Sequence, residues 1–142
     1  MATNSIKQTI ETIEDTITNF FNDQVRAVYF EKFSNTQDDR LLPCFTFYYA
    51  DGSQFGSNVN SVAFECELRD SIVGREDEDD RRKEVVSDCF QIASKIVAKL
   101  KDVGLNIEEP ITPSLFDNMT NDGLGGVSFV LVVNIARPCL TI

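Results

Sequence analysis

Apolar side chains near the N-terminus recur at alternating steps of four and three, which is the spacing of one face of an amphipathic helix. They are Ile6, Ile10, Ile13, Ile17, Phe20 and Phe21. Ser5 followed by Gln8 fits a capping box at the start of this helix. We expect the apolar face to pack on the sheet of the same domain. Pairing with a neighbouring subunit is the alternative.

The pattern then changes to one typical of strands. β-branched and aromatic residues concentrate in the segments 25–33, 41–49 and 62–72. In the third segment, apolar residues alternate with Glu65, Glu67 and Arg69, as in a half-buried antiparallel strand. The polar chain between the second and third segments, through Val59, predicts an exposed loop or a ragged edge of the sheet.

A second helical period occupies 81–103 and ends before Gly104, a typical C-cap residue. The acidic run 76–80 precedes it and lysines occupy its last turns, so both ends match the helix macrodipole. A short strand is expected at 105–107.

The closing strand is expected at 126–136, and both of its faces are apolar. One face carries Val127, Phe129, Leu131, Val133 and Ile135. Val130 and Val132 make the other face apolar too, which predicts a strand that is central or covered on both sides. The segment before it, 110–125, is rich in turn residues, and a loop of that length inside a compact domain is usually functional.

The predicted order of elements is α-β-β-β-α-(β)-β. It indicates an α+β fold with a mostly antiparallel sheet and two helices packed on it. The 142 residues suit a single domain over 1–142, with enough buried surface to fold without a disulfide or a metal.

Composition excludes several classes of function. The chain has no His, so Ser-His-Asp and Cys-His nucleophile pairs and His-liganded metals are impossible. The formal net charge of −10 argues against a surface that binds nucleic acid and against binding to an anionic membrane. The N-terminus lacks the pattern of a secretory signal, and no apolar run approaches the roughly 20 residues that span a bilayer.

The widely spaced cysteines are expected to be reduced, buried hydrophobic side chains: Cys44, Cys66, Cys89 and Cys139.

Three patterns in the sequence are candidates for a chemical site. Glu65 and Glu67 share one face of a strand and could perform acid/base work, although a solvent-facing sheet surface or a channel wall fits them as well. The run 76–80 could hold a hard cation, but it lacks the spacing of a calcium loop and reads as a solvated helix start. The glycine-rich 123–126 leads into a strand instead of a helix, which disfavours a phosphate site. We therefore predict no catalytic residue, no cofactor and no metal.

Apolar side chains exceed what one small core needs, and such a surplus marks contact with partners. They lie in the 110–125 segment, on the second face of the closing strand and in the C-terminal tail. The candidate interface residues are Leu115, Phe116, Met119, Val130, Val132, Leu140 and Ile142.

Three features of the chain form a familiar combination. An N-terminal helix leads into a β-meander. Residues 61–68 run through an acidic turn into a long helix. The loop Pro113-Ser114-Leu115-Phe116-Asp117 and the glycines after Asp122 lead into an alternating strand that ends at Arg137-Pro138. In these features the chain resembles the tail-terminator and head–tail connector ring proteins of tailed bacteriophages.

The resemblance implies a homo-oligomeric ring at the junction of capsid and tail, stacked on other neck or tail proteins, with DNA passing through its centre. The expected function is structural, not enzymatic: a virion protein assembled in the host cytoplasm, with no sequence-specific nucleic-acid binding and no membrane attachment. Glu65 and Glu67 are candidate channel or solvent-facing acids, since negative charge would let DNA slide. The alternatives are a small-molecule-binding α+β regulatory module and an enzyme that uses Glu65, Glu67 or a cysteine.

Overall fold

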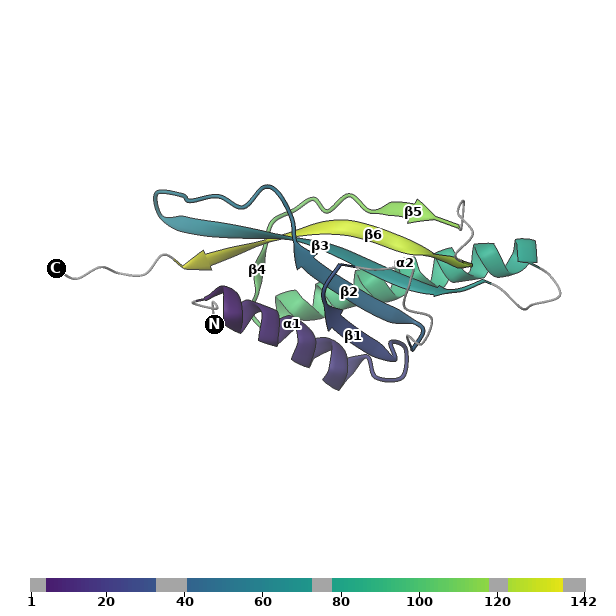
Figure 1. Ribbon diagram of the computed structural model, residues 1–142. Helices are drawn as coiled ribbons and strands as arrows, with labels where there is room; N and C mark the ends of the chain where they lie inside the picture. The colour runs from purple at the N-terminus through teal and green to yellow at the C-terminus, as the bar shows by residue number, and fades with distance from the viewer. Residues whose placement is uncertain (1–4, 33–40, 73–77, 118–122, 137–142) are drawn as a thin grey trace.

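The computed structural model describes residues 5–32, 41–72, 78–117 and 123–136. Within them the chain forms two helices and a sheet of six strands (Figure 1). The elements are α1 (Ile6–Phe20), β1 (Ala27–Phe30), β2 (Cys44–Tyr49), β3 (Val59–Ser71), α2 (Glu78–Asp102), β4 (Asn106–Ile107), β5 (Ser114–Phe116) and β6 (Leu124–Ala136).

The sheet has the strand order β1-β2-β3-β6-β4, and β5 pairs with β6 as well. β3 and β6 form its long antiparallel centre, in register from Val59 opposite Ala136 to Ser71 opposite Leu124. β6 is therefore central, as its two apolar faces predict. The described residues cover only one of its faces, because Val130 on the other face stays 47% exposed.

β1 pairs with β2 in parallel, with Ala27 opposite Cys44 and Phe30 opposite Phe47. The expected β-meander is therefore wrong at this edge of the sheet. A parallel neighbour requires a connection long enough to return to the same end of the sheet, and the chain from 31 to 43 has that length. The other strand pairs are antiparallel, which confirms a mostly antiparallel α+β fold.

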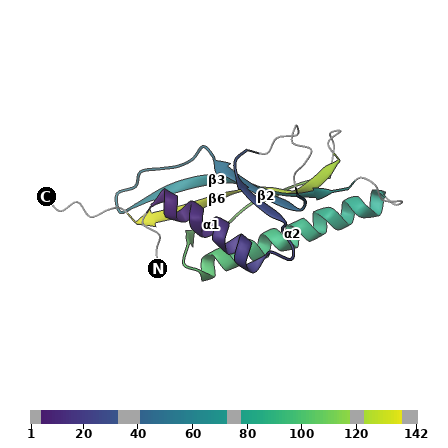
Figure 2. The same cartoon turned by 60° about the horizontal axis from the view of Figure 1, so that its bottom comes forward.

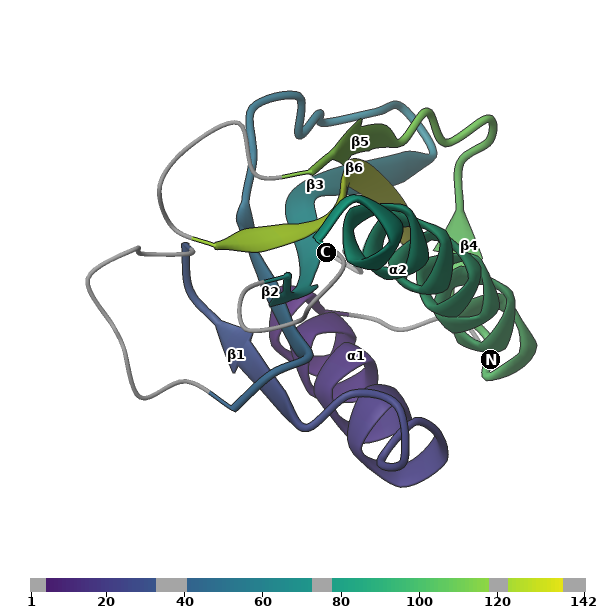
Figure 3. The same ribbon diagram turned by 90° about the vertical axis from the view of Figure 1, so that its right-hand side faces the viewer.

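Both helices lie on one face of the sheet, so that the core forms between them and the strands (Figures 2 and 3). The side chains of β3 and β6 that face the helices are buried, and they meet the inward stripe of each helix. In α1, Ile13 and Ile17 are buried, but Ile6 and Phe20 at the ends of the predicted stripe are exposed. The helix thus packs on its own domain through its middle turns.

The start of α1 and the end of α2 are fixed as the sequence predicts, whereas α2 begins at Glu78, inside the acidic run, and not at the expected Arg81. The Ser5 hydroxyl accepts a hydrogen bond from the Gln8 N–H at 3.0 Å, which caps α1. After α2, Gly104 has a φ of 108°, and the next N–H, that of Leu105, donates to the Leu100 carbonyl at 3.1 Å. This is a Schellman motif, in which glycine takes the left-handed position at no steric cost.

The segment 110–125 is not wholly a loop, because it contains the short edge strand β5. Ser114 lies opposite Ser128 and Phe116 opposite Gly126. Three residues are too few to show an alternating pattern, and Pro113 masks the strand by adding a turn signal beside it. The pairing fixes this segment on β6 and holds it near α2.

Candidate functional site

The acids predicted to line a surface lie on the face of the sheet that carries no helix among the described residues. Glu65 and Glu67 border a shallow polar hollow of about 240 Å³, together with Thr46, Tyr48 and Arg69. Arg69 donates to Oε2 of Glu67 from Nε at 2.9 Å and from Nη2 at 2.6 Å. Glu67 is thus held in an ion pair, whereas Glu65 is exposed. The two carboxylates share a face as predicted, but only one of them is an available negative charge at the surface.

Arg69 also contacts the edge strand. Its guanidinium carbon lies 4.6 Å from the centroid of the Phe116 ring, and Gly126 is the residue between them across the sheet. A Cβ on Gly126 would overlap the carbonyl oxygen of Leu68, so the glycine is required by close approach of the strands. Gly126, the last glycine of 123–126, therefore has a packing role in the sheet.

The predicted interface residues whose placement is described do not form one patch. Leu115 and Phe116 are neighbours on β5 and so point to opposite sides of it. Leu115 is 56% exposed, while Phe116 is half-buried under Arg69. Val130 and the half-buried Val132 lie on the open face. Met119, Leu140 and Ile142 lie outside the described residues, and their interface role stays a prediction.

The most exposed large apolar side chain of the described residues belongs to none of these predicted sites. Phe55, in the loop between β2 and β3, is 97% exposed. The backbone around it is braced: Gln54 and Ser61 exchange N–H to carbonyl hydrogen bonds at 3.0 and 2.9 Å. Beyond it, the Gly56 N–H donates to Oδ1 of Asn60 at 3.3 Å. The loop thus presents an aromatic ring to solvent on an ordered support.

The sequence predicts an exposed polar segment here, and Phe55 is not among the predicted interface residues. The available signal was the phenylalanine itself, flanked by Gln54 and Gly56 in an otherwise polar stretch with no apolar partner at strand spacing. A Cβ on Gly56 would overlap the carbonyl oxygen of Val59, so the turn after the ring requires glycine.

The second feature missed from sequence is an apolar groove of about 640 Å³ between α2, β6 and the segment 109–113. Phe90, Val97, Ile111 and Phe129 are among its lining residues, and Phe90 is 41% exposed. At one end the ammonium of Lys101 pairs with the carboxylate of Glu109, which ties the 109–113 segment to the helix. We call this feature the α2 groove; it arises because 109–113 crosses beside the helix without packing tightly on it.

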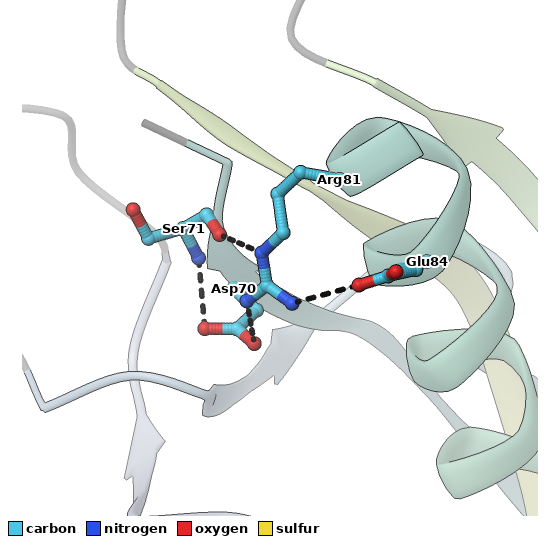
Figure 4. A network of polar contacts seen from close by, with 4 residues as sticks. All are labelled: Asp70, Ser71, Arg81 and Glu84. Atoms are coloured by element: carbon cyan, nitrogen blue, oxygen red, sulfur yellow. Dashed lines mark hydrogen bonds and ion pairs between the residues drawn. The ribbon is translucent and has the colours of Figure 1, made fainter. Parts of the chain in front are cut away.

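The start of α2, at the far end from this ion pair, is fixed to β3 by a second polar network (Figure 4). Arg81 donates from Nη2 to Oδ2 of Asp70 and from Nε to the Ser71 carbonyl, both at 3.2 Å. Its Nη1 lies 3.8 Å from Oε2 of Glu84. With the Arg81 side chain 15% exposed, this network holds the helix on the sheet and so sets the position of the groove.

The described cysteines are free thiols in the core, as predicted: Cys44, Cys66 and Cys89. Burial, with the nearby carboxylates of Glu65 and Glu67, raises the pKa of the Cys66 thiol. Burial also raises the pKa of Cys89 to about 12. A nucleophilic cysteine needs a lowered pKa and access to solvent, and neither thiol has them. Cys139 lies outside the described residues.

Among the residues whose placement is described, His, Cys, Asp and Glu side chains form no group of three or more that could hold a metal ion. Neither described helix has an apolar run long enough to cross a bilayer. In comparisons of the sequence with known proteins, no protein-family model and no curated protein matches the chain.

Proposed function

We propose that the protein is a structural subunit that assembles with copies of itself into a ring at the head–tail junction or tail end of a tailed phage. The observation that carries the proposal is the exposure of Phe55 on a braced loop. An aromatic ring held in water contributes nothing to the stability of its own subunit, and it stabilises an assembly once another surface covers it.

The charge of the chain supports the further role of the ring as a DNA conduit. With a formal net charge of −10, a ring of subunits repels phosphates, and DNA can pass without binding. Exposed Glu65 on the open face of the sheet is a candidate for the channel wall. Other neck or tail proteins would stack on the ring, in the virion, after assembly in the host cytoplasm.

The mass of the purified protein in solution tests this proposal. Light scattering across a wide concentration range, followed by negative-stain imaging of the same sample, should show annular particles of several subunits. A monomer at every concentration, with no annular particles, would contradict it. A ring with a strongly basic channel would contradict the conduit role alone.

The α2 groove favours one second candidate, a small-molecule-binding module. Ligand pockets typically have volumes of roughly 300–1,000 Å³ and apolar walls with a few polar groups. The groove, at about 640 Å³ with Lys101 and Glu109 at one end, meets that description. This candidate predicts a rise in melting temperature with an apolar metabolite and a protein that stays monomeric.

A further inference from the structure

Two apolar surfaces of the subunit lie apart in the fold. The 50–58 loop continues the β2 edge of the sheet, where Gln54 pairs with Ser61 of β3, and it extends past the end of the other strands in Figure 1. The α2 groove lies against β6, at Val127 and Phe129. Because Phe55 is 97% exposed, it does not occupy the groove of its own subunit.

The two surfaces match in chemistry. The groove is lined by Phe90, which is 41% exposed, and by Phe129, so that an inserted phenyl group would meet aromatic side chains. Its volume of about 640 Å³ can accept a ring together with the two small residues that follow it, Gly56 and Ser57.

Charge favours the loop over the acidic parts of the surface. The rim of the groove carries Asp102 and Glu109 against Lys101, so an acidic segment would be repelled there. The chain from 52 to 64 contains no charged residue, in a protein with 23 acidic ones. The loop can therefore enter this rim without burying an unpaired charge.

We propose that Phe55 of one subunit inserts into the α2 groove of a second copy of the chain. Donor and acceptor are different surfaces, so the contact is heterologous: each subunit gives its loop to one neighbour and receives the loop of another, and a ring results when the rotation closes. One phenylalanine buries about 150–250 Å². A stable interface buries about 1,200–2,000 Å² in total, so Phe55 is the anchor and the surrounding surfaces supply the remaining area.

This pairing rests on the proposed assembly, and disulfide trapping tests it separately. Two variants, Q54C and S94C, are prepared in a background in which Cys139 is replaced by serine. Gln54 is exposed and adjoins Phe55, which stays in place, and Ser94 lines the groove on the exposed side of α2. Oxidation of the mixture should give a covalent dimer that contains one chain of each variant. The matched control is T18C in place of S94C, because Thr18 is exposed on α1 and lines no part of the groove. The control mixture should give no such dimer.

Complementation gives a second, independent measurement. F55A removes the inserted ring and A98R fills the groove from the exposed Ala98, so each variant alone should be monomeric. When the two variants are mixed, the intact loop of A98R can enter the intact groove of F55A. The expected product is a 1:1 dimer that grows no further.

The outcomes separate the two proposals. The insertion of Phe55 would be overturned if wild type and F55A formed rings of the same size and oxidation trapped no dimer. The ring proposal would still stand in that case. Both the ring and the insertion of Phe55 would be overturned if the wild type were monomeric and bound the apolar dye anilinonaphthalene sulfonate, and if A98R lost that binding. The groove would then be a small-molecule site.

Discussion

Arg69 and Phe116 form a contact across Gly126 that joins the centre of the sheet to its short edge strand, with 4.6 Å between the guanidinium carbon and the ring centroid. Gly126 has no side chain, and the Phe116 ring covers the space that it leaves. The Arg69 guanidinium also pairs with Glu67. The edge strand β5 is thus held by a side-chain contact as well as by its backbone ladder, which explains how three residues form a stable strand.

A double-mutant cycle measures this contact. Arg69→Ala and Phe116→Ala should each lower the free energy of unfolding. The coupling energy between them should be about 0.5–2 kcal/mol, the range for a cation–π pair that is partly shielded from water. Urea unfolding of the two single variants and the double variant provides the values. A coupling energy of zero would show that the ring and the guanidinium are neighbours without interaction.

Gly126→Ala should destabilise the sheet by about 1–3 kcal/mol, the usual cost of forcing atoms into a packed site. The reason is the overlap of the new Cβ with the Leu68 carbonyl oxygen. Gly125→Ala is the matched control, because its Cβ would lie 3.3 Å from the nearest atom, the Phe116 carbonyl oxygen, and a small shift relieves that contact. Equal losses in the two variants would contradict the close-approach explanation.

Arg81→Ala should lower stability by about 1.5–3 kcal/mol, since it removes hydrogen bonds to a charged partner that is shielded from water. The variant leaves the Asp70 carboxylate without its guanidinium at the junction of β3 and α2. Thermal unfolding followed by circular dichroism measures the loss, and Lys83→Ala, an exposed position on the same helix, should change little. If both variants melt at the wild-type temperature, Arg81 does not anchor the helix.

Stability should fall at high pH because of the buried thiols. The pKa of Cys89 is about 12 in the folded protein against an ordinary value of 9.0, so the unfolded chain releases this proton first. The free energy of unfolding therefore falls from about pH 9 towards pH 12, by at most about 1.4 kcal/mol per pH unit for one thiol. Cys89→Ala should show a shallower decline than the wild type over this window, as measured by urea unfolding at each pH. Identical declines would mean that Cys89 ionises alike in both states.

The strongly periodic elements were predictable from the sequence. The middle turns of both helical stripes, the alternation in β3 and one apolar face of β6 predict burial correctly, because each residue's environment repeats with the period of its own element. The exceptions are Val130 on the second face of β6 and Ile6 and Phe20 at the ends of the α1 stripe, which are exposed. Gly104 and Ser5 also revealed their caps, since these positions need particular residue types.

The features that were missed depend on contacts between distant segments. Whether Ala27–Phe30 pairs in parallel or antiparallel depends on the path of the connection to Cys44. The α2 groove requires knowledge of where 109–113 crosses the helix. Phenylalanine is usually buried, so residue type alone predicts burial of Phe55, whereas the structure shows it exposed.

The chain contains no tryptophan, so F55W gives a single fluorescent reporter at the exposed loop. Its emission spectrum, recorded as the protein is concentrated from dilute monomer, tests most directly whether a second copy covers this position. The account predicts a shift of the emission to shorter wavelength that follows the increase in particle mass measured by light scattering. An emission maximum that stays at the wavelength of a hydrated indole while the particles grow would contradict it.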